Sequence, residues 1–441
     1  MSEGEGTQVS LPPRPTESDP EAWKTYWKAQ GQPWRTEPEI DLERQKYLAK
    51  RRSTTPDIKQ GIYPFKDVKL SRADVEWLLA THENERGPVD WSDESQRKRV
   101  GLDLRGTDLR RLNLSGLPLA GMYAGSRYWS YATEDQHEAA LAHLEGASLV
   151  SAHLEGAFLV HAHLENADLS SAHLENATLN RAHLVGAWLV NVHLESASLK
   201  EAHLEGASLG SAYLARTNLR NVFFDHTTQL YGIVLGNKKS GIALFVDIHW
   251  GDVNLAVVNW TQVDMLGEEY EARQKTNWDR RVKDRAARLE EYEVAVRANR
   301  QLAVALQAQG LNEVAARFAY RAQKLQRVVL RRQRKFGQYL FYLFLNVLAG
   351  YGYRPGRSVF WYLVIIVGFS LAYYSFGHLP LLPDAFVFSL TSFHGRGFFP
   401  GLGNETSLHN PLVVLAAIEA VVGLFIEISF IATFTQRFFG K

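Results

Sequence analysis

Side chains able to interact with ions stand close together in the stretch Asp384 to Pro400, which reads DAFVFSLTSFHGRGFFP. Pro383 and Asp384 predict a helix start, and Gly395 and Gly397 predict its end and an irregular loop. His394 and Arg396 lie in this loop. An arginine that faces a pore repels cations and favours anions. The chemistry expected of this stretch is therefore ion selection.

Two apolar runs flank this stretch and must position it. Residues 358–376 carry no ionisable charge, and residues 411–436 are broken only by Glu419 and Glu427 before Arg437. Each run is long enough to cross a bilayer as a helix, which takes about 20 apolar residues. Irregular backbone at membrane depth survives only where protein buries it or where it lines water. Residues 384–400 are therefore predicted to form a pore helix and a pore loop between two spans.

At this point residues 340–441 resemble the two-transmembrane pore-loop family, which is potassium-channel-like. Ser389, Leu390, Thr391 and Ser392 stand where that family has its Ser/Thr-rich helix end, and Gly395 and Gly397 stand where it has its filter glycines. The resemblance implies a homotetramer around a four-fold axis. It also implies that the pore and filter consist of Thr391, Ser392, Phe393, His394, Gly395, Arg396, Gly397 and Phe398.

The filter departs from the potassium-channel pattern Thr-Val-Gly-Tyr-Gly, whose carbonyls replace the hydration shell of the ion. The corresponding run here is Phe-His-Gly-Arg-Gly-Phe, and an alternative register from Gly397 loses the second glycine. If Arg396 faces the lumen, four copies form a cationic ring. If it points behind the loop, Glu419 is its expected partner, because intramembrane carboxylates are normally paired or wet. Ion selectivity stays open.

The second span carries further candidate gating or pairing residues. Gly423 is a candidate hinge, or else a close-packing site. Glu427 lies about two helical turns after Glu419, so both side chains point towards one side. Glu427 is predicted to line the cavity below the filter or to pair with a neighbouring subunit.

Composition and charge limit the location and class of the protein. The chain has 441 residues, a formal net charge of +1 and no cysteine, which excludes disulfides and thiolate metal sites. We expect no signal peptide, because Met1 to Asp19 is polar and has no apolar core of the signal type. Basic residues flank the spans on one side and predict an inner-membrane, multi-pass protein with both termini cytoplasmic: Arg327, Arg331, Arg332, Arg334, Lys335, Arg354, Arg357, Arg437 and Lys441.

The N-terminal hundred residues show no catalytic constellation. Residues 1–20 are low in apolar content and predicted to be disordered. Residues 21–100 are expected to form a mixed region that caps the solenoid predicted after it, because the ends of a solenoid need a polar cover. Within it, Ser71 precedes an amphipathic run and is predicted to cap a helix.

A period of five governs residues 101–266, with insertions at 122–141 and 227–247. Leucine recurs every five residues from Leu144 to Leu219, usually with alanine two residues earlier. Neither a helix, with a period of 3.6, nor a strand, with a period of 2, can bury this pattern, whereas a solenoid of five-residue sides can. The pattern resembles the pentapeptide-repeat family, which implies a right-handed quadrilateral β-helix.

Histidine precedes alternate leucines of this solenoid. On a four-sided coil, residues ten apart lie on opposite sides, so two ladders are predicted: His143, His163, His183 and His203, and His153, His173 and His193. Glutamates two residues after most of these histidines follow the same rule. Stacked imidazoles would sense pH, because they repel one another when charged. Metal binding is the second interpretation. Simple solvation of the coil by duplicated surface residues is the third.

The charge of the solenoid does not indicate a mimic of nucleic acid. Some pentapeptide-repeat proteins resemble DNA, but here the glutamates are neighboured by histidine and arginine, so we expect no nucleic-acid partner.

Residues 267–335 are predicted to form a cytosolic helical hairpin with Asn312 capping its second helix. Residues 336–354 are predicted to lie on the inner leaflet, with a buried core helix as the alternative.

The sequence as a whole predicts a multidomain fold: a β-helix, a helical hairpin and a two-helix pore domain at 355–441. The predicted function is a homotetrameric ion channel that contacts membrane lipid, a permeant ion and a cytosolic protein on the solenoid. The alternative is a membrane-anchored scaffold that recruits partners without conducting ions. No phosphate loop and no acid/base pair outside the repeats are present, so we expect neither an enzyme nor a cofactor.

Overall fold

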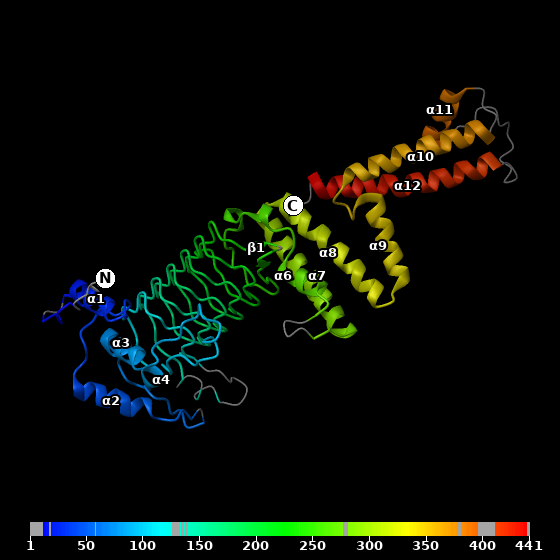
Figure 1. Ribbon diagram of the computed structural model, residues 1–441. Helices are drawn as coiled ribbons and strands as arrows, with labels where there is room; N and C mark the ends of the chain where they lie inside the picture. Colours follow the sequence, from blue (N-terminus) through cyan, green and yellow to red (C-terminus); the bar gives the residue numbers. More distant parts are fainter. Residues whose placement is uncertain are drawn as a thin grey trace, which may run out of the picture. The chain divides into compact units, whose positions relative to one another are not determined.

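The computed structural model describes residues 12–16, 19–57, 59–125, 133, 136, 140–237, 239–276, 281–376, 381–395 and 411–438. The chain divides into two compact units, Met1–Gln274 and Lys275–Lys441. Stacked coils dominate the first unit, and helices make up most of the second (Figure 1).

Short helices precede the coils: α1 (Pro20–Ala29), α2 (Leu42–Arg52), α3 (Arg72–Ala80) and α4 (His82–Glu85). Asp19, Asp41 and Ser71 cap the first three, each accepting a hydrogen bond from a backbone amide of the first turn. Ser71 and Asp74 also form a reciprocal capping box. The predicted cap at Ser71 is therefore confirmed.

A buried ion pair attaches α3 to the first coils. Arg72 and Glu76 lie 2.8 Å apart, and Glu76 is fully buried. The Glu76 carboxylate also accepts hydrogen bonds from the backbone amides of Thr36 and Glu37, each at 3.0 Å. Arg72 donates to the carbonyl oxygen of Asn113 at 3.1 Å. These bonds replace the water that both charges lose on burial.

The coils are held together by parallel bridges between residues 20 apart. His143 bridges His163, Ser148 bridges Asp168, His153 bridges His173, and Phe158 bridges Thr178. Four bridge positions, five residues apart, therefore fall in each turn, one for each predicted side. Over the described residues, continuous strands occur only in the hairpin of β1 (Gly236–Asn237) and β2 (Gly241–Ile242).

The predicted inward positions are buried. Leu164, Leu169 and Leu174 have no exposed surface, and neither do Ala162 and Ala167. Fully burying one leucine stabilises the fold by roughly 1.5–3 kcal/mol, so a stack of such layers forms a continuous core. At the corner two residues after leucine, the backbone is left-handed, as at Asn166 (φ +57°) and Asn176 (φ +61°). Asparagine and glycine tolerate this conformation better than most residues.

The segments that interrupt the coils are shorter than the two insertions predicted from the sequence. Tyr123 bridges both Asp103 and Phe158, so the coil continues past residue 122. Gln229 and Val234 also bridge to the preceding coil, although they fall in the predicted insertion 227–247. Both segments keep the bridge positions because each such residue finds a backbone partner in the neighbouring coil.

A short helix closes the last coil. It follows two 3₁₀ turns, η2 (Leu255–Val257) and η3 (Trp260–Gln262), and is labelled α6 (Gly267–Arg273). A Cβ on Gly267 would lie 2.5 Å from the carbonyl oxygen of Ile242, so only glycine allows this approach. The buried Glu268 carboxylate accepts hydrogen bonds from the amides of Phe245 and Val246. Burial raises the pKa of Glu268 to about 7.

The second unit consists of helices: α7 (Arg285–Ala308), α8 (Asn312–Arg332), α9 (Phe336–Ala349), α10 (Pro355–Phe376), α11 (Leu382–Phe393) and α12 (Pro411–Phe438). Gly310 (φ +75°) separates α7 from α8, and the two helices form the hairpin predicted within 267–335. The predicted cap at Asn312 is wrong. Leu311 occupies the cap position without a side-chain bond, and Asn312 is the first helical residue.

Two helical segments are long and apolar enough to cross a membrane. They are Gly356–Phe376 and Leu412–Ile431, with mean hydropathies of 1.8 and 2.3. Most of the residues in each segment are not buried within the described chain. Helix α9 likewise exposes Phe336, Leu340 and Phe341, so the alternative of a buried core helix does not hold within the described chain.

The cap at Glu268 predicts a specific pH dependence of stability. The raised pKa means that the folded state keeps a proton which the unfolded state releases, so this group's contribution to stability falls as pH rises from about 4.5 to about 7. Glu268→Gln removes this titration. Thermal unfolding followed by circular dichroism should therefore show the variant losing less stability than the wild type over that range.

Glu271→Gln is the control, because it changes a half-exposed carboxylate of the same helix. Its melting temperature should follow that of the wild type across the range. A difference between Glu268→Gln and the wild type that does not vary with pH would show that the buried carboxyl ionises equally in both states.

Candidate functional site

Helix α11 packs against both α10 and α12, and aromatic side chains fix its position. Phe388 meets Tyr373 of α10 edge to face at 4.7 Å, and Phe393 meets Tyr362 in the same way at 4.9 Å. Phe393 also packs with Ile366 and Ile426 in a buried cluster. The short helix is thus held at its middle and at its C-terminal end.

Gly423 allows α12 to approach the last turn of α11. A Cβ on this residue would lie 2.2 Å from the carbonyl oxygen of Phe393 and 3.1 Å from its ring. Any larger residue would push the two helices apart. This geometry corresponds to the close-packing alternative for Gly423, while its role as a hinge stays a prediction.

Glu419 lies fully buried among the three helices. One carboxylate oxygen accepts a hydrogen bond from the Tyr373 hydroxyl at 2.7 Å, and the other bonds to the Ser389 hydroxyl. Ser389 also lies 3.0 Å from the carbonyl oxygen of Ile366. Each carboxylate oxygen therefore has a hydroxyl partner from a neighbouring helix. Arg396, the partner predicted from the sequence, lies outside the described residues, as do Gly397 and Phe398.

A second polar contact lies at the C-terminal end of α11. His394 Nδ1 bonds to the Glu427 carboxylate, and His394 Nε2 lies 3.3 Å from the Tyr362 hydroxyl. The side chains of His394 and Glu427 are 40% and 35% exposed, in contrast to the buried Glu419. Gly395 ends the helix with a left-handed backbone (φ +66°).

The remaining predicted filter residues have local roles in α11. The Thr391 hydroxyl donates to the carbonyl oxygen of Phe388 at 2.9 Å, and Ser392 is buried. Sequence reasoning missed Tyr362 and Tyr373 as partners. The tyrosine hydroxyls in the otherwise apolar run 358–376 were the available signal, because a buried hydroxyl needs a partner.

The predicted histidine ladders are present in the first unit. His143, His163, His183 and His203 stack at centroid distances of 5.3, 5.0 and 5.5 Å. His153, His173 and His193 stack at 4.9 and 4.8 Å. Phe223 and Tyr213 continue the two stacks in the next coil. The 20-residue turn thus brings side chains together that are far apart in sequence.

Most ladder histidines pair with a glutamate of their own coil. The Nδ1–Oε1 distance is 3.0 Å for His143 and Glu145, 2.9 Å for His153 and Glu155, and 3.1 Å for His163 and Glu165. The hydrogen bond that His153 donates to the Glu155 carboxylate raises the pKa of His153. Such pairs fix the orientation of each ring.

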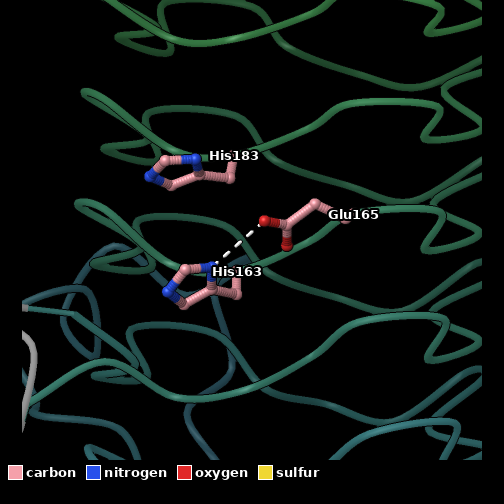
Figure 2. Close-up of side chains that lie close together, drawn as sticks. All are labelled: His163, Glu165 and His183. Carbon is pink, nitrogen blue, oxygen red and sulfur yellow. Dashed lines mark hydrogen bonds and ion pairs between the residues drawn. The ribbon is translucent and has the colours of Figure 1, made fainter.

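His183 differs because Val185 replaces the glutamate. Burial lowers the pKa of His183, and the neighbouring His163 lowers it further. Its ring is tilted by 19° from that of His163, compared with 5–10° for the other histidine pairs. Figure 2 shows Glu165 beside both rings, bonded to His163.

Two groups in the ladders have ligand atoms close enough to share a metal ion. They are His163, Glu165 and His183, and His173, Glu175 and His193. In each group, one ligand atom from every residue lies within 4.8 Å of the other two. Imidazole nitrogen and carboxylate oxygen are ligands of zinc and related ions.

Comparison with known proteins identifies the coiled region. The family model for pentapeptide repeats (8 copies) matches residues 147–186, 159–195 and 197–228. No curated protein matches the chain.

Several solved structures are similar to the coils. The pentapeptide repeat protein Rfr23 from the cyanobacterium Cyanothece 51142 is 30% identical, covering 36% of this chain and 93% of its own, with a TM-score of 0.20. HetL from Nostoc sp. strain PCC 7120, a protein involved in heterocyst differentiation regulation, is 18% identical (41% and 79% covered, TM-score 0.20). A protein of the Arabidopsis thaliana thylakoid lumen is 23% identical (28% and 76% covered, TM-score 0.18). The repeat match therefore shows that this chain contains a pentapeptide-repeat domain.

Proposed function

We propose that this chain is a membrane ion channel with a cytosolic pentapeptide-repeat domain. The observation that carries the proposal is helix α11. It has 12 residues, so it extends about 18 Å and is too short to cross a bilayer. It is nevertheless apolar and packs against both α10 and α12. A half-helix between two spanning helices, ending at Gly395, is the arrangement of a pore helix.

The polar contacts of α11 support a pore over a simple anchor. An anchor needs only apolar helices, and buried polar groups in a membrane are costly unless they are bonded. Here Glu419 is bonded by hydroxyls from α10 and α11, which fixes the half-helix between the spans. His394 and Glu427 stay partly exposed where α11 ends. An imidazole and a carboxyl group left partly exposed at this place fit the wall of a water-filled cavity.

A pore of this type needs several copies. We propose a homotetramer in which His394, Glu427 and the loop after Gly395 surround the axis. Membrane lipid contacts the exposed apolar faces of α10 and α12, such as Phe360 and Phe425. The basic residues before α10 favour an inner-membrane location with both termini cytoplasmic. The pentapeptide-repeat domain would then act as a sensor or as a docking surface for a cytosolic protein. No enzymatic activity is proposed.

Planar-bilayer recording of the purified chain in asymmetric potassium chloride tests the proposal directly. A reversal potential near that of chloride places Arg396 or His394 in the lumen, and one near that of potassium means that carbonyl oxygens select the ion. Absence of current over a wide range of pH and voltage, from a tetramer of intact secondary structure, would favour the anchored scaffold.

Replacing either of two glutamates of α12 with glutamine should give different results, because the two carboxylates lie in different surroundings. Glu427→Gln should shift the reversal potential toward that of chloride, because a carboxylate at the lumen attracts cations. Glu419→Gln should leave the reversal potential unchanged, because this carboxylate is buried against Tyr373 and Ser389. Its effect should instead be a lower melting temperature. Equal shifts in both variants would contradict the assignment of Glu427 to the lumen.

Arg396, in the predicted pore loop, gives a further prediction. Arg396→Ala should move the reversal potential toward that of potassium if the arginine lines the lumen, since the cationic ring is lost. If it pairs with Glu419 in the assembly, the reversal potential should stay constant and the tetramer should dissociate at a lower detergent concentration or temperature. Size-exclusion chromatography with light scattering distinguishes the two results.

A further inference from the structure

We propose that His163, Glu165 and His183 form a binding site for a divalent transition-metal ion such as Zn²⁺. The equivalent group in the other ladder, His173, Glu175 and His193, forms a second site of the same kind. Both sites lie within the pentapeptide-repeat domain, so the proposal does not depend on the channel function.

The ligand set of the first site spans two consecutive coils. His163 and Glu165 belong to one coil, and His183 lies on the next, stacked at 5.0 Å above His163. One ligand atom of each lies within 4.8 Å of the other two (Figure 2). Bound Zn²⁺ holds nitrogen and oxygen ligands at about 2.0–2.2 Å, so small side-chain rotations are enough to close the site. Two histidines and one carboxylate would leave the remaining coordination positions of the metal ion to water.

One carboxylate oxygen of Glu165 is available to bind a metal ion between the two coils. Its Oε1 bonds to His163, but its Oε2 is shielded from solvent and has no hydrogen-bond donor among the described residues. A buried carboxylate oxygen without a partner is costly. A cation between the coils would satisfy it.

The upper histidine of each group has either no carboxylate partner or a more distant one in its own coil. His183 has Val185 in place of a glutamate. In the second group, the Nδ1–Oε1 distance from His193 to Glu195 is 3.5 Å, longer than the 2.9–3.2 Å of the other pairs. The ring of His183 also has the largest tilt in either ladder. These rings therefore have the freedom to turn toward the glutamate of the coil below.

The same ladder contains a matched site that lacks one ligand. His203 and Glu205 form the same hydrogen bond, at 3.1 Å, and Glu205 Oε2 is likewise buried without a partner among the described residues. The next coil presents Phe223 instead of histidine. Glu205 is thus the natural control for Glu165.

Isothermal titration of the tag-free full chain with Zn²⁺ tests the inference. We expect two ions per chain for the wild type and for Glu205→Gln. Glu165→Gln and His183→Gln should each reduce this to one ion, or raise the Kd of one site at least about tenfold. Co²⁺ should give a visible absorption band that loses intensity in the same two variants. Circular dichroism of each variant confirms that the coils are intact.

Several outcomes would overturn the proposal. The wild type would bind no Zn²⁺, or Glu205→Gln would lose as much binding as Glu165→Gln. In the first case the ladders only solvate the coil. In the second case, Zn²⁺ binds to the histidines of the ladders in general and not to the two proposed sites. His183→Gln removes a ligand without touching the His163–Glu165 bond, so a folded variant with unchanged stoichiometry would also exclude the site.

Discussion

The first unit depends on one constraint: a single 20-residue coil cannot bury its own leucines and must have a neighbour on each side. Within the stack, the next coil provides that neighbour, so burial repeats without change. The two ends need another solution. At the last coil, the buried Glu268 carboxylate accepts two consecutive backbone amides of that coil. Capping an edge in this way satisfies amides that would otherwise be buried without partners. At the other end, the buried Arg72–Glu76 pair joins α3 to the first coils, where Arg72 donates to the carbonyl oxygen of Asn113.

The second unit meets a related constraint with different groups. In helices surrounded by apolar side chains, a carboxylate has few partners, and Glu419 uses hydroxyls from two neighbouring helices. Hydroxyls add little desolvation cost of their own, unlike a second charge. Gly423 then lets the backbone of α12 contact that of α11 closely. Position and packing of the half-helix therefore depend on a small number of residues, each with a distinct contact.

The parts of the fold that follow from periodicity could be predicted, and the parts that depend on unique tertiary contacts could not. The period of five determines which residues face inward, and a 20-residue turn places His163 under His183. The absence of a glutamate at Val185 is also visible in the sequence. By contrast, nothing local marks Glu268 as the cap among many glutamates, because its partners Phe245 and Val246 are defined only once the last coil has formed. The hydroxyl partners of Glu419 likewise come from segments 30 and 46 residues away.

The bridge spacing of 20 residues also determines how the rod can change in length. Removing one full turn shortens the stack and leaves every face aligned, because each later residue moves to the equivalent place one layer down. Removing a single five-residue side rotates all later side chains onto the adjacent face and separates the histidines from their stacks. Within the regular coils, duplication or loss of sequence therefore keeps the stacks aligned only when it adds or removes whole 20-residue turns.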